Sequence, residues 1–231
     1  MAWRCSGKTN VELIDNLFKN GLITSARIRD AMMKVDRAHY CPSPSYAYED
    51  SPQSIGHAAT ISAPHMHASA CESLLPFLKP GSRVLDIGSG SGYLTAVLAE
   101  LVRDGGKGGR VVGLEHIKAL KELGEGNMEK SERGMEMMST GLVEFVVGDG
   151  RKGLKDEEGW DAIHVGAAAV ELHEELIEQL RSPGRIFIPV EDSDGYGDQH
   201  IWTVDKDAKG AVTKKKLYGV RYVPLTDAPL T

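Results

Sequence analysis

The sequence predicts an α/β fold, namely a doubly wound, mostly parallel sheet with a C-terminal antiparallel hairpin and an N-terminal helical cap. Short apolar strands alternate with amphipathic helices after residue 80, a pattern typical of βαβ units in a parallel sheet. The first of these strands runs directly into glycines, as in nucleotide-binding α/β folds. Only a turn-rich stretch separates the last two strands, which favours a hairpin.

The N-terminal cap is expected to contain two helices. Apolar residues recur three and four positions apart over residues 11–19 and again over 25–35, which is the helical period. Thr24 or Ser25 can cap the second helix. Residues 41–66 are rich in proline, serine, tyrosine and histidine, so we expect an extended surface segment there.

The elements of the sheet region follow in order along the chain. Short apolar runs predict five strands, at 83–87, 110–114, 143–147, 161–165 and 185–189. Helices are expected at 93–102, over a methionine-containing stretch broken near Gly134, and at 171–180. The hairpin is expected to pair residues 201–204 with 216–223.

Length and charge exclude several classes of protein. The 231 residues suit one domain spanning 1–231, with helices and the active-site segment in 1–79 and the cofactor-binding sheet and C-terminal strands in 80–231. Lysine and arginine total 27 against 33 acidic residues, a net charge of −6. Because non-specific nucleic-acid binding needs a basic surface, we expect no nucleic-acid partner. No apolar run approaches the about 18 residues of a membrane span, so no membrane partner is expected.

Compartment and assembly are predicted from weaker signals. The N-terminal residues lack the apolar segment of a signal peptide. Cys5, Cys41 and Cys71 are odd in number and widely spaced, so they indicate neither a disulfide framework nor a metal site. We therefore expect a cytosolic protein without a metal. No long exposed apolar face is evident, which favours a monomer.

The glycine loop is the strongest local motif. Gly88-Ser89-Gly90-Ser91-Gly92 has the spacing G-x-G-x-G, whereas a dinucleotide-binding loop has G-x-G-x-x-G. Asp86 lies two residues before the first glycine. A carboxylate there would repel a pyrophosphate but suits a ligand that carries an ammonium and a sulfonium group. The loop therefore favours S-adenosylmethionine over NAD.

Two further acids follow the next two strands. Glu115 ends the second strand, where a nucleotide's ribose diol is bound in such folds. Asp149 follows the third strand and could accept a hydrogen bond from an adenine amino group. Taken singly, each acid could equally be a solvated strand end or a turn residue. Their shared position at the carboxyl ends of consecutive strands is what indicates a ligand site.

Residues 59–68, A-T-I-S-A-P-H-M-H-A, are more specific than the glycine loop. On this run the chain resembles the protein-L-isoaspartate (D-aspartate) O-methyltransferase family over almost its whole length. Other matching stretches are 36–40, 50–56, 85–92, 146–151, 161–169 and 219–226. Without this resemblance, the histidines of the run would suggest at most an incomplete metal site, and Ser62 a helix cap.

The resemblance also implies roles for individual residues. Ser62 would be the active-site hydroxyl beside the substrate carboxylate, and Ile61 is expected to contact the substrate as well. Independently of the resemblance, the strand pattern suggests that the backbone of Tyr222, Val223 and Leu225 binds the substrate backbone. The residues implied to bind the cofactor are Pro64, His65, Met66, His67, Asp86, Ile87, Gly88, Ser89, Gly90, Glu115, His116, Asp149, Gly150 and Thr226. Glu115 stands where many members of the family have the shorter aspartate. The sequence ends at Thr231, so the cofactor contacts that a longer C-terminal tail makes in some members are not expected from it. Residues 103–109 are a glycine-rich insert.

The implied reaction is transfer of a methyl group from S-adenosyl-L-methionine to the free carboxylate of L-isoaspartyl residues, leaving S-adenosyl-L-homocysteine. Damaged proteins and peptides would be the substrates, repaired through a succinimide, and the acceptance of D-aspartyl residues is left open. A carboxylate with a pKa of about 3.9 is ionised near neutral pH, so no general base is required. The alternatives are a methyltransferase for a small molecule, a nucleic acid or another protein carboxylate, and a binding module without catalysis. An NAD-dependent dehydrogenase is disfavoured by the glycine spacing and Asp86.

Overall fold

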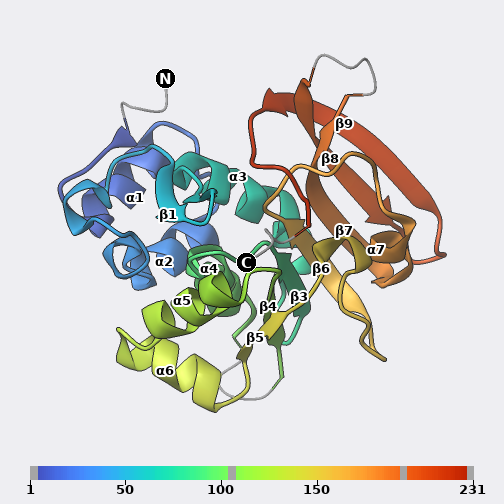
Figure 1. Cartoon of the computed structure of the whole chain (residues 1–231), viewed down its shortest axis with the longest axis horizontal. Coiled ribbons are helices and arrows are strands. Elements are labelled where there is room, and N and C mark those ends of the chain that lie inside the picture. Colours follow the sequence, from blue (N-terminus) through green and yellow to red (C-terminus); the bar gives the residue numbers. More distant parts are fainter. Residues whose placement is uncertain (1–4, 104–107, 193–196, 228–231) are drawn as a thin grey trace.

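The computed structural model describes residues 5–103, 108–192 and 197–227, and its main feature is a seven-stranded sheet (Figure 1). The strand order is β5-β4-β3-β6-β7-β8-β9. The strands are β3 (Arg83–Ile87), β4 (Arg110–Glu115), β5 (Val143–Val147), β6 (Trp160–Val165), β7 (Leu180–Glu191), β8 (Gln199–Lys206) and β9 (Val212–Val220). The pairs from β5 to β7 are parallel, and β7–β8 and β8–β9 are antiparallel. The predicted fold class is confirmed.

The N-terminal helices α1 (Asn10–Lys19) and α2 (Ala26–Lys34) form where the apolar periodicity predicts them. The cap of α2 differs from the prediction. Ser25 occupies the N-cap position but makes no side-chain cap hydrogen bond. Instead, the Glu72 carboxylate accepts from the backbone N–H groups of Thr24 and Ser25, at 2.6 and 2.9 Å. A residue of another helix therefore satisfies donors that a local side chain was expected to bind.

Residues 41–66 are more structured than the extended segment that their composition predicts. They contain the antiparallel hairpin of β1 (Gln53–Gly56) and β2 (Ala59–Ile61) and the first residues of α3 (Pro64–Leu74). His57 and Ala58 form the hairpin turn with φ of 51° and 56°. These left-handed values are uncommon for residues other than glycine, so the composition gave no turn signal.

The later helices differ from the predicted ones mainly at their ends. They are α4 (Tyr93–Val102), α5 (Lys118–Met128), α6 (Glu132–Ser139) and α7 (Glu174–Glu178). The break in the methionine-containing stretch lies between α5 and α6, and Gly134 lies inside α6, where its N–H donates to the N-cap Ser131 hydroxyl. Helix α7 is shorter than expected, and β9 begins and ends earlier. Single-turn 3₁₀ helices occupy Arg37–His39, Pro44–Tyr46, Leu75–Phe77 and Gly150–Lys152.

The sheet has a buried apolar cluster on each face. One cluster joins alternate strand residues such as Val84 and Val111 to helices α1 to α6, so the N-terminal segment and the sheet share one core. The other contains Trp160 and is covered largely by α7. Figure 1 shows the N-terminal helices beside α4 and α5, with β8 and β9 at the opposite side of the molecule. No helix within the described ranges is long and apolar enough to cross a membrane.

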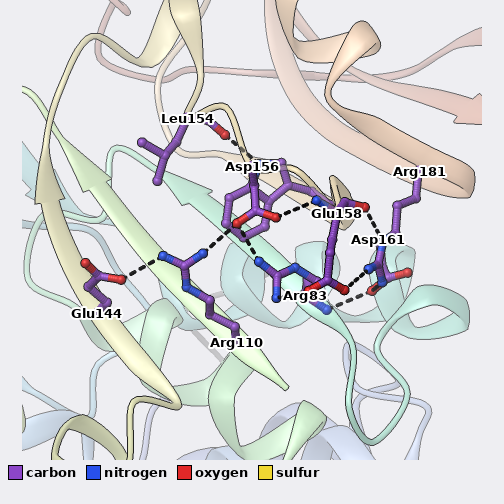
Figure 2. Close-up of polar contacts among 9 residues, drawn as sticks. Arg83, Arg110, Glu144, Leu154, Asp156, Glu158, Asp161 and Arg181 are labelled. Atoms are coloured by element: carbon purple, nitrogen blue, oxygen red, sulfur yellow. Dashed lines mark hydrogen bonds and ion pairs between the residues drawn. The ribbon is translucent and has the colours of Figure 1, made fainter. Parts of the chain in front are cut away.

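An ion-pair network closes the amino ends of the parallel strands (Figure 2). Asp156 accepts from Arg83, which begins β3, and from Arg110, which begins β4, the latter at 2.6 Å. Both guanidinium groups lie over the buried Trp160 ring, 5.7 and 5.8 Å from its centroid. Asp161 also accepts from the Arg83 N–H at 2.7 Å. The network therefore stabilises the end of the sheet opposite the strand termini that carry the candidate ligand residues.

Candidate active site

A cavity of about 250 Å³ lies at the carboxyl ends of β3, β4 and β6. Open α/β sheets bind ligands at this edge, because the strand ends and the loops after them converge there. Its walls contain many of the residues assigned from the sequence: Ile87, Gly88, Gly90, Glu115, His116, Gly150, Val223, Leu225 and Thr226. The tertiary structure thus brings together residues that are separated by up to 139 positions in the chain.

The glycine loop turns sharply from β3 into α4. Gly88, Gly90 and Gly92 have φ of 73°, 50° and 80°, all in the region that favours glycine. At Gly92 a Cβ would also lie 3.2 Å from the backbone of Gly124. The backbone N–H of Gly88 donates to the Leu114 carbonyl at 2.8 Å, which ties the loop to the end of β4. The loop is therefore held in a conformation that exposes its backbone to the cavity.

Glu115 is the most firmly positioned acid of the cavity. Its carboxylate accepts three backbone hydrogen bonds, from the N–H groups of Gly90, His116 and Ile117 at 3.0, 2.9 and 3.1 Å. Only 5% of the residue is exposed. A carboxylate held by three amide donors keeps lone pairs for a ligand and needs no reorganisation to accept from hydroxyl groups. This arrangement suits a ribose diol.

Asp86 and Ser89 line a smaller adjoining cavity of about 30 Å³. Both Asp86 carboxylate oxygens already have partners, His164 Nδ1 at 2.8 Å and Thr95 Oγ1 at 2.6 Å. His164 is buried and stacks on Phe187. The Ser89 hydroxyl, in contrast, is buried without a hydrogen-bond partner among the described residues. An unpaired polar atom at a cavity wall marks a position where a bound ligand would complete the hydrogen bond.

Ser62 lies where the small cavity meets a wider groove of about 490 Å³. The groove is bounded by β9 and the start of α3, and Tyr222, His65 and Met66 also line it. Ser62 does not cap α3, because the N-cap residue is Ala63. The Asp50 carboxylate caps the helix instead. It accepts from the backbone N–H of His65 at 2.9 Å and also contacts His65 Nδ1 at 2.8 Å.

His67 faces the small cavity from the first turn of α3 and is buried. Burial lowers the pKa of the imidazole well below its ordinary value, and the neighbouring Arg37 guanidinium lowers this pKa further. The Arg37 Nη1 lies 3.4 Å from Nδ1 of His67. His67 is therefore neutral at physiological pH, with Nδ1 positioned to accept a hydrogen bond from Arg37.

The C-terminal stretch after β9 forms the wall between the large cavity and the groove. Most of its backbone groups already have partners: Tyr222 N–H donates to Gln199, Leu225 N–H donates to the Ala168 carbonyl, and the Val223 carbonyl accepts from Ala168. Pro224 has no N–H. Of the three backbone N–H groups in residues 222–225, only that of Val223 has no hydrogen-bond acceptor among the described residues.

Some sequence-assigned residues lie elsewhere. Asp149 does not line the cavities described above, and its carboxylate pairs with the Arg151 guanidinium through two hydrogen bonds of 2.9 Å. The hydrogen bond from Arg151 lowers the pKa of that carboxyl group. Pro64 is buried at the first turn of α3, and Ile61 is buried beside Ser62, where it lines the small cavity. The roles of these residues stay predictions.

Sequence reasoning missed several residues of the cavity walls. Thr60 lines the large cavity, the small cavity and the groove. Gly166 follows β6 directly, so the rule that selected Glu115 at the end of β4 could also have found it. His57 and Ala58 reach the large cavity from the β1–β2 turn, and no local signal indicated them.

Comparisons with known proteins agree with this geometry. The family model for protein-L-isoaspartate(D-aspartate) O-methyltransferase matches residues 8–229. The chain is 47% identical to a protein-L-isoaspartate O-methyltransferase of Caenorhabditis elegans, covering 98% of this chain and 96% of that protein. It is 46% identical to protein-L-isoaspartate O-methyltransferase 1 of Arabidopsis thaliana, covering 94% and 91%. A Plasmodium falciparum protein-L-isoaspartate O-methyltransferase, solved in complex with S-adenosyl-L-homocysteine, superposes with a TM-score of 0.86 at 33% identity, covering 95% of this chain and 99% of that one.

Proposed function

Because the chain belongs to the protein-L-isoaspartate(D-aspartate) O-methyltransferase family, we propose that it methylates the free carboxylate of L-isoaspartyl residues in damaged proteins and peptides and so starts their repair. The methyl donor is S-adenosyl-L-methionine, and the coproduct is S-adenosyl-L-homocysteine. The observation that carries the proposal is the position of Ser62 where an open groove meets the small cavity, which in turn adjoins the Glu115 cavity.

The residues of the large cavity fit this cofactor. Glu115, held by three backbone donors, would accept from the ribose hydroxyls. In the adjoining small cavity, the Ser89 hydroxyl, which has no hydrogen-bond partner among the described residues, and the backbone of Gly88 would meet the methionine end. At Gly150 a Cβ would lie 2.4 Å from Ile87 Cγ2, so glycine allows the close packing of this wall, beside which the adenine would lie. The bound cofactor supplies an electrophilic methyl group on a sulfonium.

The acceptor side requires positioning rather than proton transfer. An isoaspartyl carboxylate is ionised near neutral pH and is already a nucleophile. Ser62 would donate a hydrogen bond to one carboxylate oxygen and leave the other directed at the methyl group. The Val223 N–H would be a second donor. Holding the reacting atoms in line can supply about 7–11 kcal/mol of the barrier.

Selectivity against ordinary aspartate would depend on the substrate backbone. Isoaspartate inserts one methylene into the main chain and leaves its carboxylate on a shorter arm, so the backbone must approach Ser62 differently. The groove, lined by β9 and the start of α3, opens beside Ser62 and is where the substrate backbone would lie.

Methyl transfer to matched peptides tests the proposal. Three synthetic peptides would differ only at one residue, L-isoaspartate, D-aspartate or L-aspartate, and would be incubated with labelled S-adenosyl-L-methionine. We expect a base-labile methyl ester on the isoaspartyl peptide and none on the L-aspartyl peptide, and the D-aspartyl peptide tests the second substrate of the family name. Equal labelling of the L-isoaspartyl and L-aspartyl peptides, or of neither, would contradict the assignment.

Three further features belong to the same proposal. We propose one methyltransferase domain, because a single buried cluster links helices α1 and α2 with the sheet. We propose a cytosolic monomer, supported by three cysteines that are buried and free of disulfides. Gel filtration with light scattering would test the monomer. No nucleic acid or membrane is needed for the proposed reaction.

A further inference from the structure

Arg37 is a fully buried cation without a carboxylate partner. Its exposure is 0%, and no ion pair within 4.0 Å involves it among the described residues. Buried charges are normally paired, because an isolated ion loses its hydration on burial. Asp86 contacts His164, and Asp50 contacts His65 through Oδ1, while the buried Oδ2 of Asp50 has no hydrogen-bond partner among the described residues.

The guanidinium lies directly behind Ser62. Nη2 donates to the Ser62 carbonyl oxygen at 2.8 Å, and Nη1 lies 3.4 Å from His67 Nδ1. The guanidinium carbon lies 5.2 Å from the centroid of the Tyr93 ring. The buried Nε has no hydrogen-bond partner within the described chain. These contacts hold the Ser62 peptide unit in place and leave Arg37 without an ion pair among the described residues. Burial lowers the pKa of its guanidinium, and the more distant Asp50 carboxylate opposes that lowering.

Among the described residues, the other titratable groups near Ser62 do not supply a positive charge comparable to that of Arg37. His67 is neutral, as argued above, and His164 is hydrogen-bonded to the Asp86 carboxylate. In the groove, His65 contacts Asp50, and Arg221 is exposed, so solvent and salt screen its charge. Around Arg37 itself, Cys41, Tyr40 and Tyr93 are buried, and burial raises the pKa of each, so all three are uncharged at neutral pH.

We propose that Arg37 is a positioning residue of the acceptor site, which fixes the Ser62 backbone and makes the pocket prefer an ionised carboxylate over a neutral group of the same shape. The inference rests on the proposed function. Methyl transfer converts the carboxylate into a neutral ester, so the acceptor has to enter ionised and lose its charge on the way. A cation separated from the acceptor by the Ser62 peptide favours the ionised form without a direct ion pair that methylation would have to break.

The test is a binding ratio. Calorimetry at pH 7 would measure two peptides on enzyme saturated with S-adenosyl-L-homocysteine: the isoaspartyl peptide, and an analogue in which a carboxamide replaces the free carboxylate. The wild-type protein is expected to prefer the carboxylate. Arg37→Met should lower this preference by about tenfold, as expected for loss of one nearby charge in a medium of intermediate dielectric. Equal weakening of both peptides would mean that Arg37 is only structural and would overturn the proposal.

A second variant keeps the test valid if Arg37→Met does not fold. Arg37→Lys retains the charge but lacks the planar fork whose two nitrogens reach the Ser62 carbonyl and His67. We expect it to bind both peptides more weakly and to keep the preference for the carboxylate. Loss of the preference in Arg37→Lys would contradict the proposed role of the charge.

Arg185→Met is the matched control. Arg185 also donates to a backbone carbonyl, that of Ser73 at 2.7 Å, and also lies over an aromatic ring, that of Phe77 at 5.3 Å. It differs from Arg37 in its ion pair with Asp205, and it lines neither the groove nor the small cavity. It should lower thermal stability without changing the ratio. If the wild-type protein binds isoaspartyl and aspartyl peptides equally, the proposed function fails. If it discriminates between them and Arg37→Met keeps the full ratio, only this inference fails.

Discussion

The Glu115 carboxylate accepts a hydrogen bond of 3.0 Å from the backbone N–H of Gly90, 25 positions earlier in the chain. This bond links the end of β4 to the glycine loop after β3. It combines the two features that the sequence marked separately, the glycine spacing and the acid at a strand end. One side chain thus both shapes the loop and presents oxygen atoms to the cavity.

Replacing Glu115 should therefore weaken cofactor binding. In Glu115→Gln, an NH2 group takes the place of one oxygen and meets backbone donors instead of acceptors. Loss of charge-assisted bonds of about 1.5–3 kcal/mol predicts a 10- to 150-fold weaker affinity for S-adenosyl-L-homocysteine, measured by calorimetry. Glu122→Gln, at an exposed position of α5, is the control and should bind as the wild type does. Wild-type affinity in Glu115→Gln would refute the assigned role.

Ser62→Ala should reduce methyl transfer while leaving cofactor affinity unchanged. The hydroxyl is proposed to orient an ionised carboxylate, and a bond of this kind corresponds to about 1.5–3 kcal/mol, or a 10- to 150-fold lower kcat/KM. Steady-state kinetics with the isoaspartyl peptide would measure the loss. Ser139→Ala removes an exposed hydroxyl that bonds only to its own helix and should have no effect. An unchanged kcat/KM in Ser62→Ala would rule out the hydroxyl as the orienting group.

Stability should fall in mild acid because of His67. Burial, and then the charge of Arg37, lower the pKa of His67 in the folded state. An unfolded histidine has a pKa of about 6.5, so below that pH the unfolded chain binds a proton that the folded chain excludes. Neutral His67 therefore contributes fully to the free energy of unfolding above about pH 6.5. As the pH falls below this value, the free energy of unfolding decreases by up to about 1.4 kcal/mol per pH unit. Urea unfolding at several pH values should show a shallower slope for His67→Gln, and an identical slope would contradict the argument.

The ion-pair network in Figure 2 should contribute to stability and not to activity. Asp156→Asn removes the charge shared by Arg83 and Arg110, whose side chains are 16% and 30% exposed against 12% for Asp156. We expect a loss of about 1–3 kcal/mol, and a domain of this size loses about 2–4 °C in Tm per kcal/mol. Glu144→Gln, whose side chain is 53% exposed, should change Tm little. Scanning calorimetry would measure both, and an unchanged Tm for Asp156→Asn would disprove the contribution.

Much of the fold and part of the site follow from local sequence. Strands β3 to β6 are apolar runs bounded by turns, and the register between them places Glu115 and Gly88 at one edge. The β1–β2 hairpin was not predictable, because its turn residues His57 and Ala58 have a left-handed backbone that their side chains do not favour. The boundaries of α7 and β9 were also misplaced, since helix ends depend on partners outside the helix.

Sequence alone therefore determined the alternation of strands and helices after residue 80, the glycine loop and the acid at the end of β4, since each depends on residues near one another in the chain. Tertiary structure decided which groups remain available. It engaged both Asp86 oxygens, paired Asp149 with Arg151, and placed Arg37 behind Ser62. Hydrogen-bond partners in a packed interior come from segments that are distant in the chain. Because the local dielectric is low there, each hydrogen bond is strong and each unpaired polar group is costly, so these partners determine the chemistry of the site.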